Sequence, residues 1–152
     1  MKLYIAYGSN LNLEQMKLRC PSSKLWGTGF IKDWELVYRG SKTGAYATIR
    51  RKMNSYVPVG IWKITQRDEL ALDRYEGYPR FYQKYVIDFL SNGHSNTGMV
   101  YIMRPDSMPG KPSEHYIDVI YKGYQELGLD FRFLYDSLIK NKQEANPKKE
   151  GN

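Results

Sequence analysis

The sequence predicts an α+β fold in which a sheet precedes a helical last third. Short segments rich in β-branched and aromatic residues recur between residues 3 and 104, separated by turn residues. From residue 113 onward, apolar residues recur instead at helical spacing. Pro58 and Gly60 interrupt one expected strand, which indicates an edge or a bend of the kind that a curved sheet needs. A barrel-like sheet is therefore expected.

The chain begins with a short apolar strand, expected at residues 3–7, that runs into the loop Gly8-Ser9-Asn10-Leu11. A helix should follow at once, capped by Asn12 together with Gln15 and closed by Pro21. A strand, a glycine loop and a helix N-terminus in succession leave backbone N–H groups free for a carboxylate or a phosphate. The alternative is an ordinary strand-to-helix turn, and the loop lacks the Walker and G-x-G-x-x-G patterns of nucleotide sites.

The segment after this helix predicts four strands. We expect two of them within residues 25–39, with Asp33-Trp34 near the turn between them. Two more are expected at 45–50 and 56–64, after a loop that contains Gly40 and Gly44.

A helix is predicted to end at Glu76, which is our candidate catalytic residue. Thr65 and Asp68 form a capping box at its start. Gly77 permits left-handed backbone angles and Pro79 cannot extend a helix, so Glu76 should sit on a tight corner. A glutamate before a glycine also occurs at ordinary helix ends, so this corner alone does not establish a site.

Two further strands, at 82–90 and 99–104, should be joined by a hairpin near Asn92-Gly93. Ser113 then caps a helix that Gly128 ends, and Asp130 starts another. We expect a single domain over residues 1–140 and a polar, disordered tail over 141–152.

Composition restricts the possible partners. The formal net charge of +7 is scattered, and only Arg50-Arg51-Lys52 approaches a cluster, so nucleic-acid binding is not expected. No apolar run approaches the roughly 20 residues that span a bilayer, and the first apolar run is too short for a signal peptide. A cytoplasmic protein with no membrane partner, monomeric or weakly dimeric, is expected.

The single cysteine, Cys20, lies in an apolar helical stripe. It is expected to be a core thiol rather than a nucleophile, in a protein of a reducing compartment. One Cys and two separated His residues give no zinc-ligand spacing, so we expect no metal and no cofactor.

Several of these segments together resemble the γ-glutamylcyclotransferase family over nearly the whole chain, up to about residue 138. The matching fragments are Tyr7-Gly8-Ser9-Asn10-Leu11, Gly60-Ile61-Trp62, Leu72-Asp73 leading to Glu76-Gly77, Tyr82, and Pro112-Ser113 followed by Tyr116, Gly123 and Gly128-Leu129.

The resemblance implies a mixed β-sheet closed into a small barrel with surrounding helices. It also implies an enzyme, of an amine-releasing lyase or acyltransferase type, that converts γ-glutamyl amino acids or amines to 5-oxoproline. Glu76 matches the family's acid/base glutamate. The matches to the substrate-binding residues are Tyr7, Gly8, Ser9, Asn10, Leu11, Tyr82, Tyr101 and Tyr116. The Ser9-Asn10 pair resembles the γ-glutamyl-amino-acid branch, and nothing in the sequence identifies the residues that select the leaving group.

The reaction that the resemblance implies suits a carboxylate held among tyrosines. The substrate's α-amine attacks its own γ-carbonyl, so positioning and proton transfer suffice. With pKa values of about 4.3 for Glu and about 8 for the amine, proton transfer to an exposed glutamate would be uphill by roughly 5 kcal/mol. Burial against Tyr75, Tyr78 or Tyr82 should therefore raise the pKa of Glu76. Most of the 14 tyrosines must instead pack in the core.

The sequence leaves a second class of function open. The same pocket could bind an anionic metabolite or a peptide carboxylate without catalysis. That reading predicts stabilisation by the ligand without formation of product.

Overall fold

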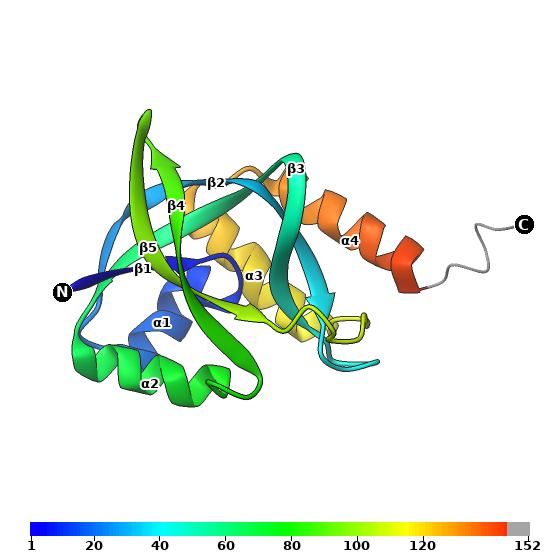
Figure 1. Ribbon diagram of the computed structural model, residues 1–152, viewed down its shortest axis with the longest axis horizontal. Helices are drawn as coiled ribbons and strands as arrows, with labels where there is room; N and C mark the ends of the chain where they lie inside the picture. The colour runs from blue at the N-terminus through cyan, green and yellow to red at the C-terminus, as the bar shows by residue number, and fades with distance from the viewer. Residues whose placement is uncertain (146–152) are drawn as a thin grey trace, which may run out of the picture.

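A computed structural model describes residues 1–145 of the chain and shows five strands closed into a barrel, in the order β1-β3-β2-β4-β5 (Figure 1). The strands are β1 (Lys2–Ala6), β2 (Lys24–Arg39), β3 (Tyr46–Ile64), β4 (Tyr82–Ser91) and β5 (His94–Met103). Neighbouring strands are antiparallel, except that β1 and β5 are parallel and pair at Tyr4 and Met99. The sheet is therefore mixed, which confirms the expected α+β barrel.

The four strands expected between residues 25 and 64 are in fact two, so that prediction was wrong. Asp33, placed near a turn, has a positive φ of 66° but lies at a bulge within the continuous strand β2. Its carboxylate accepts a hydrogen bond from the Asn54 amide of β3 (2.9 Å), and Asn54 also has a φ of 66°. The bulge bends both strands without ending either, because pairing resumes on each side of it.

Gly60 lies where β3 pairs with two strands at once, opposite Ala6 of β1 and Thr28 of β2. A Cβ at Gly60 would stand 2.8 Å from a methyl carbon of Leu127, so the missing side chain lets a helix approach the sheet. Pro58 lies beyond the last β1–β3 pair, so its missing N–H does not interrupt pairing with β1. The segment around Pro58 and Gly60, where the sequence indicates an edge or a bend, is thus the part of β3 at which pairing with β1 begins.

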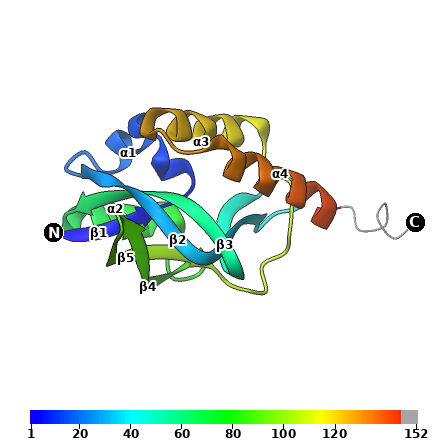
Figure 2. The same ribbon diagram turned by 90° about the horizontal axis from the view of Figure 1, so that it is seen from above.

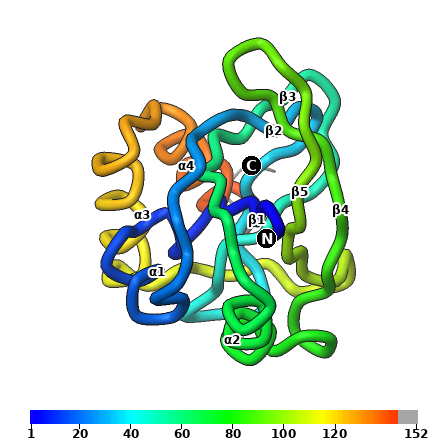
Figure 3. The backbone as a smooth tube through the Cα atoms, turned by 90° about the vertical axis from the view of Figure 1, so that its left-hand side faces the viewer, coloured from blue at the N-terminus to red at the C-terminus, as the bar shows by residue number. Residues whose placement is uncertain are grey.

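In the described part of the chain, four α-helices and one 3₁₀ turn surround the barrel. They are η1 (Ser9–Leu11), α1 (Leu13–Arg19), α2 (Gln66–Glu76), α3 (Glu114–Leu127) and α4 (Phe131–Ala145). Helices α3 and α4 lie along one side of the barrel, opposite the β4–β5 hairpin (Figures 2 and 3). Within residues 1–145, no helix is both long and apolar enough to cross a membrane.

The helix ends follow the capping signals of the sequence. Both hydrogen bonds of the Thr65–Asp68 capping box are present, and the Ser113 side chain accepts from the Tyr116 amide. Gly77 and Gly128 adopt left-handed angles, with φ of 64° and 68°, directly after α2 and α3. Glu76 is therefore the last residue of α2, as expected.

Helix α4 continues to Ala145, past the domain boundary that we expected at residue 140. Asn141 is buried and its side-chain amide donates to the Gly110 carbonyl (2.9 Å), while Arg39 pairs with Glu144 (2.7 Å). These contacts attach residues 141–145 to the domain. The rest of the expected tail, 146–152, lies outside the described residues.

Helix α3 packs closely on the η1 loop because it carries a glycine at the contact. A Cβ on Gly123 would lie 2.7 Å from the carbonyl carbon of Leu11 and 2.8 Å from the Asn12 nitrogen. These are backbone atoms, which cannot rotate away as the end of a side chain could. The loop's position therefore depends on the absence of a side chain at residue 123.

We expect Gly123→Ala to destabilise the protein by roughly 1–3 kcal/mol, the usual effect of overpacking, despite alanine's higher helix propensity. The measurement is the free energy of unfolding in urea. Gly27→Ala is the matched control, because a Cβ there would meet nothing within 4 Å. Equal stability of the Gly123→Ala variant and the wild type would show that the loop can move aside freely.

Candidate functional site

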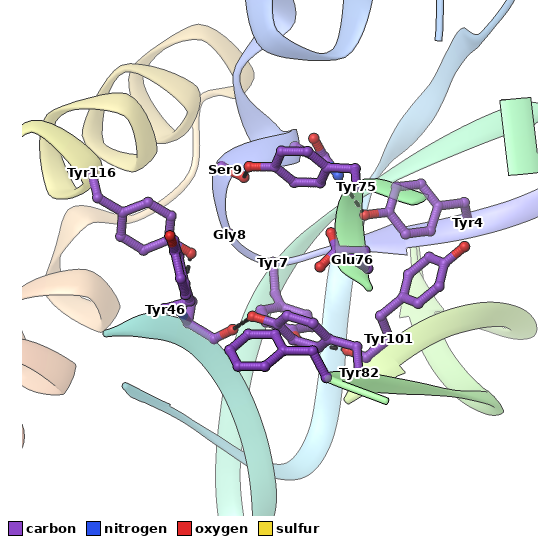
Figure 4. Close-up of a pocket in the computed structure, with 13 residues that line it drawn as sticks. Tyr4, Tyr7, Gly8, Ser9, Tyr46, Tyr75, Glu76, Tyr82, Tyr101 and Tyr116 are labelled. Atoms are coloured by element: carbon purple, nitrogen blue, oxygen red, sulfur yellow. Dashed lines mark hydrogen bonds between the residues drawn. The ribbon is translucent and has the colours of Figure 1, made fainter. Parts of the chain in front are cut away.

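A cavity of about 180 Å³ opens where the end of β1, the end of α2 and the start of β3 meet. This volume is below the roughly 300–1,000 Å³ of pockets for drug-sized ligands, so it suits a small molecule. The lining residues are Tyr4, Tyr7, Gly8, Ser9, Asn10, Tyr46, Ala47, Tyr75, Glu76, Phe81, Tyr82, Tyr101 and Tyr116. Glu76 is the only charged side chain among them, and Figure 4 shows it in the middle of the tyrosines.

The Glu76 carboxylate has no hydrogen-bond donor among the described residues, although α2 delivers it into the cavity. The surrounding protein removes hydration from the charged form, and this burial raises the pKa of Glu76 to about 7. The positive charge of Arg19 acts in the opposite direction and limits the rise of that pKa. At neutral pH, Glu76 can therefore both accept and release a proton.

Three of the surrounding tyrosines use their hydroxyl protons within the protein. Tyr7 donates to the Tyr101 carbonyl (2.6 Å), and Tyr82 donates to the Ala47 carbonyl (2.7 Å). Tyr101 donates to the Asp73 carboxylate (2.6 Å), which also contacts the Lys84 ammonium (3.0 Å). These bonds fix the rings that form the cavity wall.

Two other tyrosines accept hydrogen bonds and keep their own protons available. Tyr116 accepts from the Ala47 amide (2.9 Å), and Tyr4 accepts from the side chain of Asn10 (2.9 Å). No described residue accepts the proton of either hydroxyl. Burial, and secondarily the nearby Glu76 charge, raises the pKa of Tyr4 well above its usual value, so its hydroxyl stays protonated. Burial likewise raises the pKa of Tyr116.

The loop after β1 offers fewer backbone donors than the sequence suggests. The Leu11 amide bonds to the Gly8 carbonyl (3.0 Å), and the Leu11 side chain is fully buried in the core. Leu11 does not line the cavity, unlike the other expected binding residues. Within the described chain, the amides of Gly8, Ser9 and Asn10 have no partner, so they are the donors available to an anion.

The Asn10 side chain holds this loop in place. It donates to Tyr4 and accepts from the Arg19 guanidinium, while the Asn10 carbonyl accepts from the Trp62 indole (3.0 Å). Arg19 also lies over the Tyr75 ring, 3.6 Å from its centroid. The loop is therefore tied to α1, to β3 and to the end of α2.

Comparison with known proteins agrees with this geometry. The family model for "Gamma-glutamyl cyclotransferase, AIG2-like" matches residues 4–122, which include the loop and Glu76. The Gamma-glutamylcyclotransferases of Homo sapiens and Bos taurus are 32% and 31% identical to this chain. Each alignment covers 86% of this chain and 74% of the relative. A solved structure titled "Gamma-glutamyl cyclotransferase" superposes with a TM-score of 0.79 at 28% identity, over 93% of this chain and 86% of that one.

The chain belongs to the γ-glutamyl cyclotransferase, AIG2-like family.

Membership of the γ-glutamyl cyclotransferase family confirms the resemblance seen in the sequence. It also agrees with the expected γ-glutamylcyclotransferase-like enzyme, because the relatives carry an enzyme's name. Of the three tyrosines expected to wall Glu76, Tyr75 and Tyr82 line the cavity. Tyr78 does not; its ring lies under the Lys84 ammonium, 4.3 Å from the ring centroid.

Several residues that line the cavity of this family member, and Arg19 beside it, were not expected from its sequence. Regular strand alternation would place Tyr4 and Tyr7 on opposite faces, so the sequence carries no local signal that brings Tyr4 to the loop. Tyr46 and Phe81 follow turns in segments whose spacing carries no functional pattern. Arg19 ends an amphipathic helix, where a basic residue is ordinary.

The raised pKa of Glu76 predicts a stability effect that needs no substrate. Below about pH 4.5 the side chain is protonated in the folded and unfolded states alike. As pH rises toward 7 and beyond, the unfolded chain ionises freely while the folded chain ionises against its burial, so folded-state stability is lost. Glu76→Gln should therefore be more stable than wild type at pH 8, by at most on the order of 3 kcal/mol, and similar to it near pH 4.5.

Urea unfolding of both proteins at several pH values measures this difference. Glu14→Gln is the control, because it removes a carboxylate whose side chain is 72% exposed. A Glu76→Gln advantage that does not grow with pH would contradict the raised pKa.

Proposed function

We propose that this protein cyclises γ-glutamyl amino acids or amines to 5-oxoproline and releases the free amine, with Glu76 as the acid/base. The observation that carries the proposal is the Glu76 carboxylate, which receives no hydrogen bond from any described residue, has a pKa of about 7 and shares a cavity with the Ser9–Asn10 loop. Family membership supports the class of reaction. The assignment of roles to residues is our own.

The reaction needs one proton shuttle. Glu76 takes a proton from the substrate's α-ammonium group, and the resulting amine forms a bond to its own γ-carbonyl carbon. The γ-amide C–N bond then breaks, and Glu76 returns the proton to the departing nitrogen. The ring nitrogen still carries two hydrogens, and it loses the second to Glu76, which passes that proton to the released amine to leave 5-oxoproline and an ammonium product. Glu76 ends as it began, so neither an enzymic nucleophile nor a cofactor takes part.

The pKa of Glu76 decides whether this transfer is feasible. With an amine pKa of about 8, the difference from Glu76 is about one unit, or roughly 1.4 kcal/mol. An exposed glutamate would face roughly 5 kcal/mol for the same transfer. Burial in the cavity therefore removes most of the unfavourable free energy of the first step.

The remaining groups suit the two ends of a folded γ-glutamyl unit. The substrate's α-carboxylate would bind the free amides of Ser9 and Asn10, where the 3₁₀ turn begins. The γ-carbonyl oxygen would accept from the hydroxyl of Tyr116 or Tyr4, since those protons have no acceptor among the described residues. Both ends held together would favour ring closure.

The cellular compartment and the partners that we infer are those expected from the sequence. Cys20 is buried and unpaired, and burial raises the pKa of its thiol to about 12, which suits a core thiol in a reducing cytoplasm. A monomer or weak homodimer without a nucleic-acid partner stays a prediction.

Glu76→Gln should keep the fold and reduce turnover by at least about 100-fold, because the nearly isosteric amide cannot take the proton. The measurement is release of 5-oxoproline from γ-glutamyl amino acids, γ-glutamylamines and glutathione, with Glu14→Gln as the control. For the wild type, kcat/KM should fall as pH drops below about 7, where Glu76 becomes protonated.

Wild-type-like turnover by Glu76→Gln would remove this residue from the reaction. If the wild type forms no 5-oxoproline from any of the three substrate classes yet is stabilised by these ligands, the non-catalytic binding module becomes the better reading.

Gly8→Val should weaken binding of 5-oxoproline, which presents the carboxylate of the product, by about tenfold or more. Even a Cβ at Gly8 would lie 3.3 Å from the Ala47 side chain and 3.4 Å from the Tyr116 hydroxyl, so the larger valine would enter the cavity. Calorimetric titration measures the affinity, and thermal unfolding checks the fold. Gly8→Ala, which adds only the Cβ, should lose less. Unchanged affinity in a folded Gly8→Val variant would move the carboxylate elsewhere, with Arg50 and Arg80 the first candidates.

A further inference from the structure

The mouth of the cavity is aromatic, although its floor is formed by buried tyrosines. Tyr46 and Phe81 line the cavity and are 45% and 39% exposed, whereas Tyr82 is buried and Tyr116 is partly buried. Exposed apolar side chains are usually scattered singly over a protein surface. Two large exposed rings side by side at the opening of a cavity therefore indicate a binding surface. The two rings offer a surface that the γ-glutamyl unit itself does not need.

These two exposed rings are held firmly. The Tyr46 ring packs edge-to-face against Phe81 (6.0 Å between centroids) and against Tyr116 (5.3 Å), and Phe81 packs in the same way against Tyr82 (5.3 Å). Tyr82 and Tyr116 are fixed in turn by both backbone groups of Ala47. Tyr46 and Tyr116 lie together on one side of the cavity (Figure 4). A ligand would therefore meet a preorganised surface rather than two mobile side chains.

Phe81 is also supported from behind by a glycine. Gly40 has a φ of 98°, and a Cβ there would lie 2.7 Å from the Cζ of Phe81. The backbone of the β2–β3 connection thus packs against the Phe81 ring and leaves no room for a side chain at residue 40. The position of Phe81 is set by the fold and not by chance exposure.

Tyr75, the third exposed ring that lines the cavity, has different surroundings. Tyr75 is 45% exposed, but its hydroxyl shares a hydrogen bond with Ser9 (3.3 Å) and Arg19 covers its ring. Tyr75 therefore belongs with the loop that we assign to the substrate's α-carboxylate. A γ-glutamyl unit bound there leaves Tyr46 and Phe81 for whatever extends out of the cavity.

The charge of the cavity lining indicates which leaving-group side chains could bind at the mouth. Among the residues that the structure describes, no lysine or arginine lines the cavity, and Glu76, the one charged lining group, is engaged in the proposed proton transfer. A charged side chain on the leaving group would lose hydration at the mouth without gaining a partner. An aromatic or large apolar side chain would instead gain contact with two fixed rings.

We propose, as an extension that rests on the proposed function, that Tyr46 and Phe81 form the subsite for the released amine. The preferred substrates are then γ-glutamyl conjugates of amino acids with aromatic or large apolar side chains.

The test compares kcat/KM for γ-glutamylphenylalanine, γ-glutamylglycine, γ-glutamylaspartate and ε-(γ-glutamyl)lysine. The wild type should prefer the phenylalanine conjugate over the glycine conjugate by roughly tenfold, the range that contact with fixed aromatic rings supplies. Tyr46→Ala and Phe81→Ala should bring that ratio close to one. Tyr85→Ala is the matched control, since Tyr85 is equally exposed (45%) but lies outside the cavity, and it should keep the wild-type ratio.

Thermal unfolding establishes that each variant is folded. Tyr46→Leu and Phe81→Leu keep apolar bulk and replace any alanine variant that does not fold, and they too should lower the ratio. Equal kcat/KM for the four conjugates, or a preference for the charged ones, would overturn the subsite while leaving the proposed reaction intact.

A binding experiment separates the two proposals if the reaction fails but the subsite exists. Glu76→Gln is titrated with γ-glutamylphenylalanine and γ-glutamylglycine, with and without Tyr46→Ala. If the wild type forms no 5-oxoproline but the phenylalanine conjugate binds roughly tenfold tighter and Tyr46→Ala removes that difference, the subsite stands and the reaction falls. If neither conjugate is turned over or bound, both proposals fall.

Discussion

Two tyrosine hydroxyls that bond both backbone groups of Ala47 hold the site together. Tyr116 of α3 accepts from the Ala47 amide, and Tyr82 of β4 donates to its carbonyl. One residue at the start of β3 thereby joins a helix and a second strand that are distant in sequence. The wall of the cavity is part of the barrel's own hydrogen bonding, so the rings around Glu76 are positioned as accurately as the strands.

Glu76 stands apart from this hydrogen-bond network. The tyrosine hydroxyls around it bond to the backbone of Tyr101 or Ala47, to Asp73 or to Asn10, and among the described residues none donates to its carboxylate. A carboxylate in such a place lowers the stability of the fold at neutral pH. A departure of this kind from the general rule, that buried charges are paired, is expected at a functional site. The same isolation leaves the group free for a substrate proton.

The sequence carried the local features of the fold and of the site, but not those set by barrel closure. Caps at Thr65 and Ser113, and the left-handed Gly77, are determined by neighbouring residues, so the corner that presents Glu76 could be predicted. Asp33 has the backbone angle of a turn residue, yet pairing with β3 continues through it, and only the partner strand reveals this. Tyr4 and Tyr46 reach the cavity through strand register, and Leu11 leaves it because its amide closes the 3₁₀ turn.

The single pair that joins β1 to β5 has a consequence for ligand binding. The barrel closes in parallel register at Tyr4 and Met99, and Tyr4 also lines the cavity. A molecule that contacts the Tyr4 ring therefore rests on the seam of the barrel. If a bound ligand stabilises the β1–β5 pairing, then by thermodynamic reciprocity that pairing strengthens ligand binding by the same free energy. Ligand affinity and the rigidity of β1 should therefore rise or fall together.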